Sequence, residues 1–153
     1  MSIEVANESD AEVDLSEIRR LAEFSLDALH VSADAELGIT FIQPDTMAVL
    51  HEKWLDLPGP TDVMSFPMDE LRPGTEDRPT PAGMLGDIVV CPQVAAEQAA
   101  SAGHSTMAEI RLLTVHGLLH LLGFDHAEPE EKAQMFSLQD RLLEGFRHLG
   151  RRG

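Results

Sequence analysis

Residues 106–126 read TMAEIRLLTVHGLLHLLGFDH, and this stretch predicts a largely buried helix. Thr106 and Glu109, three residues apart, form the signature of a capping box at the start of a helix. Gly123 is a typical residue just after a helix end, so we expect the helix to run from Thr106 to Leu122. The apolar residues that indicate its burial are Ile110, Leu113, Leu118, Leu121 and Leu122.

Three histidines are spaced along this stretch as the ligands of one metal ion. His116 and His120 are four residues apart, so their imidazole rings project from the same face of the helix. Gly123 allows a sharp turn, and His126 follows three residues later, where it can turn back toward the other two. Three imidazoles without a thiolate favour zinc with an open fourth position for water, although nickel, copper and iron also accept imidazole. Such an ion keeps its double positive charge and attracts phosphodiesters.

The ligand spacing matches that of the metzincin peptidases, H-E-x-x-H-x-x-G-x-x-H. Those peptidases use the glutamate after the first histidine as general base, and this chain has Gly117 there. The motif therefore predicts the metal site without the proteolytic base. Asp125 could orient a ligand imidazole or accept a proton from water, or it could cap a helix or lie on the surface. The alternative for the histidines themselves is a set of core residues bonded to backbone carbonyls.

The rest of the chain predicts one α+β or mixed α/β domain over residues 1–153. We expect a small mixed sheet of about four strands covered by helices, with the metal site at the end of a central helix. Pro67 indicates an edge strand or a strand about to leave the sheet, and the acidic, proline-rich loop at residues 69–82 is expected to be mobile. Strands are expected at Ser2–Ala6, Leu37–Ile42, Asp62–Met68 and Met84–Cys91, and helices at Leu15–Leu29, from Pro44 to before Pro58, at Pro92–Ala102 and at Pro129–Leu149.

The charge balance argues against a broad surface for binding nucleic acid. The chain has 27 acidic and 11 basic residues, a formal net charge of -16, whereas non-specific nucleic-acid binding needs a basic surface. A local positive cleft around a metal could still hold a phosphate. Cys91 is the single cysteine, which excludes an internal disulfide and fits a reducing compartment. The acidic N-terminus lacks the features of a signal peptide, so we expect a cytoplasmic protein with no membrane segment.

Three stretches resemble the YbeY endoribonuclease family, also called the ribosomal RNA maturation factors. They are PTDVMSFP at residues 60–67, LGDIV at residues 85–89, and the histidine motif at residues 116–126. The three follow one another in the order of that family, between residues 60 and 126. The glycine after the first histidine distinguishes this motif from that of the metzincins, which makes the resemblance specific.

The resemblance implies a metal-dependent endoribonuclease that cleaves single-stranded RNA. In that family the reaction serves ribosomal RNA maturation, notably of the small-subunit RNA, and ribosome quality control. The three histidines of the family bind zinc, and the matching residues here are His116, His120 and His126. The implied partners are single-stranded or ribosomal RNA and the ribosome or small-subunit proteins, with no DNA and no membrane.

The resemblance also points to residues beside the metal. In the family fold the strands carrying Ser65 and Asp87 line one cleft, and Ser65 could bond a phosphate oxygen or could be a buried serine closing a strand end. The family commonly has an arginine where this chain has Leu55, and Lys53 and His51 are the nearest basic residues. Lys53 could supply the cation, or both could be exposed helix residues. Ser65, Lys53 and Asp125 are thus the candidate catalytic residues, with Ser65 and Lys53 as candidate substrate contacts.

Two other functions stay open from the sequence. A metalloprotease is supported by the ligand spacing and weakened by Gly117. A non-catalytic ribosome-assembly factor would use zinc only to fix the end of the helix. Structural zinc sites are usually closed by a fourth protein ligand, so this reading requires Cys91 or Asp125 on the ion.

Overall fold

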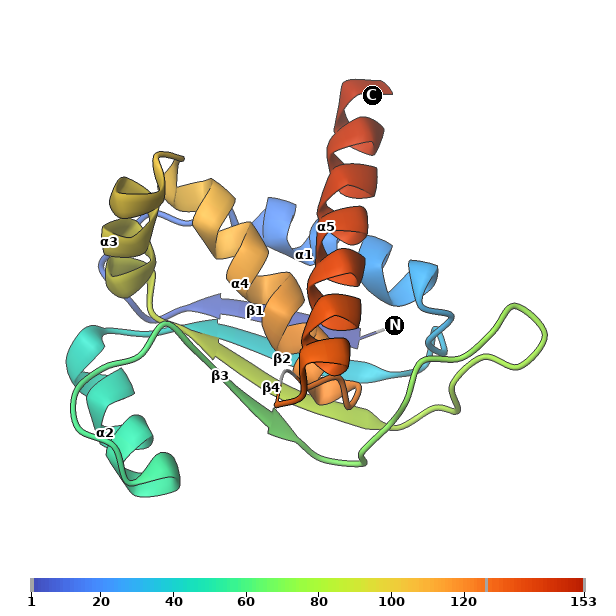
Figure 1. Cartoon of the computed structure of the whole chain (residues 1–153), viewed down its shortest axis with the longest axis horizontal. Coiled ribbons are helices and arrows are strands. Elements are labelled where there is room, and N and C mark those ends of the chain that lie inside the picture. Colours follow the sequence, from blue (N-terminus) through green and yellow to red (C-terminus); the bar gives the residue numbers. More distant parts are fainter. Residues whose placement is uncertain (1, 126, 153) are drawn as a thin grey trace.

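A four-stranded mixed sheet is the platform of the structure, a computed structural model that describes residues 2–125 and 127–152 (Figure 1). Its strands are β1 (Ser2–Asn7), β2 (Glu36–Phe41), β3 (Val63–Pro67) and β4 (Met84–Val90). They lie in the order β1-β2-β4-β3. β1 and β4 are both parallel to β2, whereas β3 runs antiparallel to β4. β3 is therefore an edge strand, which is one of the two alternatives that Pro67 indicated.

Helices cover one face of this sheet. The helices are α1 (Leu15–Ala28), α2 (Pro44–Leu55), α3 (Pro92–Ala102), α4 (Thr106–Leu121) and α5 (Pro129–Arg152). α1, α4 and α5 lie together above the sheet, and α2 stands apart at one end of it (Figure 1). This is the α+β architecture that the sequence predicted, and the bounds of the predicted elements hold to within about three residues.

Helix α4 is the central helix of the domain. It contacts β3 and β4 below it and α1, α3 and α5 beside it. This position buries all five apolar residues that the sequence singled out on this helix, namely Ile110, Leu113, Leu118, Leu121 and Leu122. They pack on strand residues that alternate toward the helices, among them Leu37, Ile39, Ile88 and Val90.

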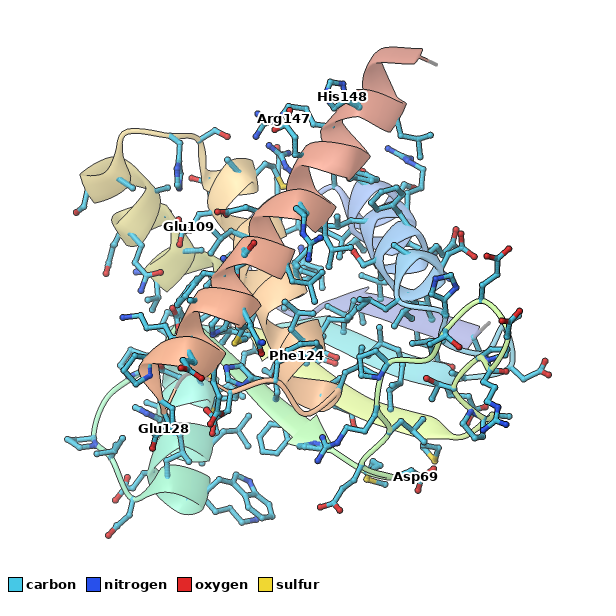
Figure 2. The ribbon with its side chains drawn as sticks, turned by 45° about the vertical axis from the view of Figure 1, so that its right-hand side comes forward. Asp69, Glu109, Phe124, Glu128, Arg147 and His148 are labelled. Atoms are coloured by element: carbon cyan, nitrogen blue, oxygen red, sulfur yellow. The ribbon has the colours of Figure 1, made fainter. Side chains whose placement is uncertain are left out.

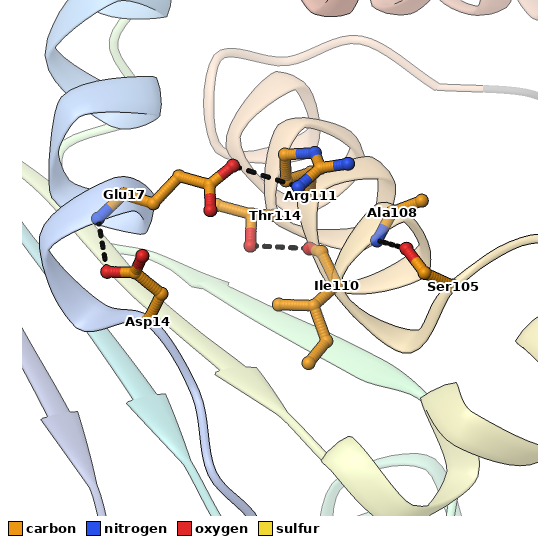
Figure 3. A network of polar contacts seen from close by, with 7 residues as sticks. All are labelled: Asp14, Glu17, Ser105, Ala108, Ile110, Arg111 and Thr114. Atoms are coloured by element: carbon orange, nitrogen blue, oxygen red, sulfur yellow. Dashed lines mark hydrogen bonds and ion pairs between the residues drawn. The ribbon is translucent and has the colours of Figure 1, made fainter.

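The start of α4 differs from the predicted capping box by one residue. Ser105 is the N-cap, because its backbone is extended and its hydroxyl accepts a hydrogen bond from the N–H of Ala108 at 3.1 Å (Figure 3). Thr106 is already the first helical residue, so it cannot cap the helix. Glu109 does not complete a capping box either, since its carboxylate binds the His104 ring nitrogen at 2.6 Å.

A polar contact joins α1 to α4. Arg111 of α4 donates to the carboxylate of Glu17 in α1 at 2.8 Å, and both side chains are partly exposed (Figure 3). Asp14 caps α1 by accepting from the N–H of Glu17 at 3.1 Å. The two helix starts are thus aligned on the same side of the sheet.

The loop at residues 69–82 is bonded to the segment that follows α1. The N–H of Thr80 donates to the carbonyl of His30 at 2.8 Å, and the N–H of Gly74 donates to the carbonyl of Leu29 at 3.0 Å. Thr80 is buried, whereas residues 75–79 between these anchors are exposed. The mobility expected for this loop stays a prediction. Across the described chain, no helix combines the length and the apolar character needed to span a membrane.

The N-cap assignment predicts a contrast between two neighbouring substitutions. Ser105→Ala should lower the free energy of unfolding by about 0.5–2 kcal/mol, because the N–H of Ala108 loses its acceptor. Thr106→Ala should leave stability unchanged or raise it by a few tenths of a kcal/mol, since alanine is the better helix former. Urea unfolding of both variants measures the difference, and equal losses would contradict the assignment.

Candidate active site

A pocket of about 790 Å³ lies along the edge strand β3, between the end of α2 and the helices α4 and α5. It takes in the segment from Asp62 to Pro67 and reaches both faces of this strand. The residues contributed by the helices are Trp54 and Leu55 from α2, Glu109, Leu112, Leu113, His116 and His120 from α4, and Phe136 from α5. The pocket therefore contains two of the three histidines of the motif.

His116 and His120 face each other in this pocket. Their Nε2 atoms are 3.1 Å apart, and their rings are inclined at 77° with centroids 4.6 Å apart. Both side chains are half-buried, whereas the residues between them, from Gly117 to Leu119, are buried against the sheet and the neighbouring helices. The helical spacing thus brings the two rings together as the sequence predicted, on the one face of α4 that opens to the pocket.

A glutamine from the last helix fixes the orientation of His116. Gln139 of α5 is 2% exposed, and its Oε1 lies 3.0 Å from Nδ1 of His116. Because the amide oxygen accepts, Nδ1 carries the proton and Nε2 presents its lone pair to the pocket. The ring of Phe136, one helical turn before Gln139, lies 5.9 Å from the His116 ring, centre to centre. This is the arrangement that metal-binding histidines commonly show, with the second nitrogen held by a buried acceptor.

The geometry of the pair fits a shared divalent cation. Two nitrogens bound to one tetrahedral zinc ion at about 2.0–2.1 Å lie about 3.3 Å apart, close to the separation of these two Nε2 atoms. The residue predicted as third ligand, His126, lies outside the described residues. Within residues 2–125 and 127–152, no cysteine, carboxylate or further histidine joins His116 and His120 in a group able to hold a metal.

The turn after α4 has the conformation that the sequence predicted for Gly123. This residue has φ 92°, and its N–H donates to the carbonyl of His120 at 3.0 Å. The N–H of Phe124 donates to the carbonyl of Leu119 at 3.0 Å, which completes a Schellman motif. Phe124 and Glu128 lie near the same end of α5, whereas Arg147 and His148 lie at its far end (Figure 2). The chain that follows His120 is thus turned back beside the start of α5.

Gly117 is a point of close contact between α4 and the sheet. A Cβ atom added here would lie 2.8 Å from Cγ2 of Ile88 and 3.1 Å from the hydroxyl of Ser65. The position after the first histidine therefore points into the sheet and not into the pocket. It has no space for the glutamate that metzincins carry, which gives a physical reason for the glycine.

Ser65 has a structural role in this contact. Its hydroxyl donates to the carbonyl of Gly117 at 2.9 Å and so holds β3 against α4. Since a serine has a single O–H proton, donating to a phosphate oxygen would require the hydroxyl to leave Gly117. Asp87 lies on the exposed side of β4, next to the buried Ile88, so its side chain points to the opposite face of the sheet from the histidines.

The remaining candidates lie at the margin of the site. Asp125 is exposed and follows the turn after α4. Lys53 is exposed on α2, with its ammonium 5.3 Å from the centre of the Trp54 ring. His51 binds the carbonyl of Gly59 through Nδ1 at 2.8 Å, away from the histidine pair. Leu55, at the place of the family arginine, is itself a pocket residue. The catalytic roles of Ser65, Lys53 and Asp125 remain predictions.

Three residues of the site were missed from the sequence. Gln139 had a detectable signal, because it is a polar residue on the apolar face that α5 shares with Met135 and Leu142. Phe136 had none beyond its apolar character. Trp54 falls within the helix expected to begin at Pro44, yet 57% of its surface is exposed, and only the structure reveals that position.

Comparisons with known proteins agree with the resemblance seen in the sequence. The family model described as endoribonuclease YbeY matches residues 4–147. Proteins named endoribonuclease YbeY are 69% identical in Clavibacter sepedonicus, over 95% of both chains, and 61% identical in Beutenbergia cavernae, over 95% of this chain and 97% of the other. A solution structure of a Thermotoga maritima protein superposes with a TM-score of 0.67 at 25% identity, over 97% of this chain and 91% of that one.

The close contact at Gly117 predicts a loss of stability on enlargement. Gly117→Ala should cost about 1–3 kcal/mol, because the added methyl group meets Ile88 and Ser65 in a packed interface. Gly117→Glu should cost more and should not create peptidase activity. Urea unfolding of the alanine variant measures the effect, and unchanged stability would show that α4 has room to move off the sheet.

The bond from Gln139 to His116 predicts a change in metal affinity. Gln139→Leu keeps the volume and removes the acceptor, so affinity for zinc should fall by about 10–100-fold. Gln139→Glu keeps an acceptor and should retain more of the affinity. Competition with a chromogenic chelator gives the dissociation constants, and Ser137→Ala, an exposed position on the same helix, is the matched control. Equal affinities for zinc in all three variants would show that Gln139 does not contribute to metal binding.

Proposed function

The chain belongs to the endoribonuclease YbeY family, and from this we propose that it is a metal-dependent hydrolase that cleaves single-stranded RNA at the pocket beside β3. The observation that carries the proposal is the pair of facing Nε2 atoms of His116 and His120, 3.1 Å apart in that pocket. The pocket is also bordered by β3, which carries most of the first stretch of family resemblance, residues 60–67.

Zinc is the cofactor we propose, with His116, His120 and His126 as its ligands. Neutral imidazoles at the observed separation suit this ion, and no thiolate is needed. When bound, the ion supplies a Lewis acid for the phosphodiester and lowers the pKa of a coordinated water toward about 7. His126 enters this proposal from the sequence motif alone.

The described residues position the reacting groups. Gln139 holds the His116 ring with its Nε2 lone pair toward the pocket, so this ligand needs no reorientation before the phosphodiester arrives. Ser65 keeps β3 and α4 together beneath the histidines. For Asp125 we propose the role of proton acceptor or of partner to a ligand imidazole, because it follows the turn that leads from His120 to His126. For Lys53 we propose contact with a phosphate at the outer rim.

The biological role proposed here is the maturation of ribosomal RNA, notably that of the small subunit, with a contribution to ribosome quality control. The support is membership of the family, and the proposed partners are ribosomal RNA and small-subunit proteins. A reducing, cytoplasmic setting agrees with the single cysteine.

The two alternatives are less well supported. A peptidase of the metzincin type needs a carboxylate base after the first histidine, and Gly117 is instead packed against Ile88. A closed structural zinc site with Cys91 as ligand is disfavoured, because Cys91 is fully buried in a separate cluster with Ile42, Met47 and Met64.

The decisive experiment compares metal content and cleavage in one variant and its control. His116→Ala should lose bound zinc and lower RNA cleavage by at least about a thousandfold, since removal of a ligand removes the metal-dependent chemistry. His148→Ala, an exposed position that pairs with Glu144 at the far end of α5, should change neither. Metal analysis and gel-based cleavage of a single-stranded RNA provide the readouts. Cleavage of casein instead of RNA by the wild-type protein would replace this proposal with the peptidase.

A further inference from the structure

Trp54 is an exposed aromatic residue at the rim of the histidine pocket. Its side chain leaves the end of α2 and is 57% exposed, although large aromatic side chains usually bury most of their surface. The indole meets the ring of Phe66 edge to face, with centroids 5.8 Å apart and planes at 72°. Phe66 is half-buried and packs on the cluster that contains Met47 and Met64. The indole is therefore supported from one side and open to solvent on another.

This aromatic pair lies across the edge of the sheet from the histidines. Phe66 pairs with Asp87 and the adjacent Ser65 pairs with Ile88, so the side chains of Phe66 and Ser65 point to opposite faces. Because β3 is the edge strand, one pocket reaches both faces and includes Trp54, Phe66, His116 and His120. A chain-like ligand crossing this edge would contact the histidines and the indole with different units.

The electrostatics of the pocket are unusual for a nucleic-acid site. Among the described residues that line it there is no lysine or arginine, and Asp62 and Glu109 are acidic. The whole chain carries a formal charge of -16. Attraction of phosphates by basic side chains, the usual source of affinity for nucleic acid, is therefore weak here. Apart from the attraction of the proposed metal ion for a phosphodiester, affinity for a single strand therefore has to come largely from contacts with the bases.

We propose that Trp54, supported by Phe66, is a stacking platform for an unpaired base that flanks the cleaved position of single-stranded RNA. The inference rests on the proposed function and extends it by assigning the base contact. Every base has an apolar face, so an exposed indole binds a single strand without reading its sequence. Bases paired in a duplex are stacked on each other and cannot reach the indole, so this contact also selects single strands.

Lys53 supplies the cation of this subsite. Its ammonium lies 5.3 Å from the centre of the indole ring, a separation at which a cation is attracted to the aromatic face. The side chain is exposed and has four rotatable carbons, so its ammonium can reach from the ring to the phosphate of the stacked nucleotide. One lysine in this place compensates in part for Leu55 at the family arginine position.

The chain has a single tryptophan and no tyrosine, so intrinsic fluorescence reports on Trp54 alone. With the metal chelated to prevent cleavage, a short single-stranded RNA should quench this fluorescence. An abasic oligomer with the same ribose-phosphate backbone should not, and duplex RNA should do so only weakly. Quenching by the abasic oligomer equal to that by the RNA would overturn the proposal, because backbone contact would then suffice.

Variants separate stacking from a structural effect. Trp54→Ala should weaken binding of a labelled single strand by about 5- to 150-fold, the range for loss of one stacked base. Trp54→Phe should restore most of that loss. Val49→Ala, at another exposed apolar position of α2 (64% exposed), should leave binding and cleavage unchanged. Affinity should fall by less than about tenfold between about 50 and 200 mM salt, unlike that of proteins that bind many phosphates.

The outcomes distinguish this inference from the proposed function. If His116→Ala abolishes cleavage but Trp54→Ala cleaves and binds like the wild type, the base platform is wrong and the nuclease stands. Unquenched fluorescence in the presence of RNA would have the same meaning. If RNA quenches Trp54 and Trp54→Ala loses binding while no cleavage occurs, the platform stands and the nuclease assignment fails.

Discussion

The architecture depends on the close approach of α4 to strands β3 and β4 at Gly117. With no side chain at this position, the helix lies directly on Ile88 and accepts the hydroxyl of Ser65 on its backbone carbonyl. This contact sets the rotation of α4 about its own axis. The residues on either side of the helix are then buried, and the remaining face, which carries His116 and His120, opens toward the pocket. The absence of a side chain at Gly117 thus allows the helix orientation in which both imidazole rings face the pocket.

A buried polar side chain also fixes the position of α5 relative to α4. Gln139 is nearly fully buried among the residues that join α5 to α4, and its amide is bonded to His116. A buried amide without a partner costs free energy, so α5 cannot shift along α4 without losing this bond. The C-terminal helix therefore contributes to the site through positioning, although its sequence carries no recognisable catalytic motif.

Much of the fold and part of the candidate site could be predicted from the sequence. Helical spacing in residues 106–126 predicted the buried helix, the shared face of the two histidines and the turn at Gly123, because these follow from local geometry. The position of Pro67 indicated an edge strand as one of two alternatives. Contacts between distant segments could not be predicted this way. Neither the pairing of Gln139 with His116 nor the contact of Trp54 with Phe66 has a local signal. Ser105, and not Thr106, caps α4, because serine directly precedes threonine here and is the stronger N-cap residue.

The guanidinium of Arg72 occupies the space beside Gly123 that any larger residue there would need. Arg72 belongs to the proline-rich loop, so this loop packs against the turn that follows His120. A larger side chain at residue 123 would displace Arg72, and the conformation of the turn therefore depends on a segment some fifty residues upstream.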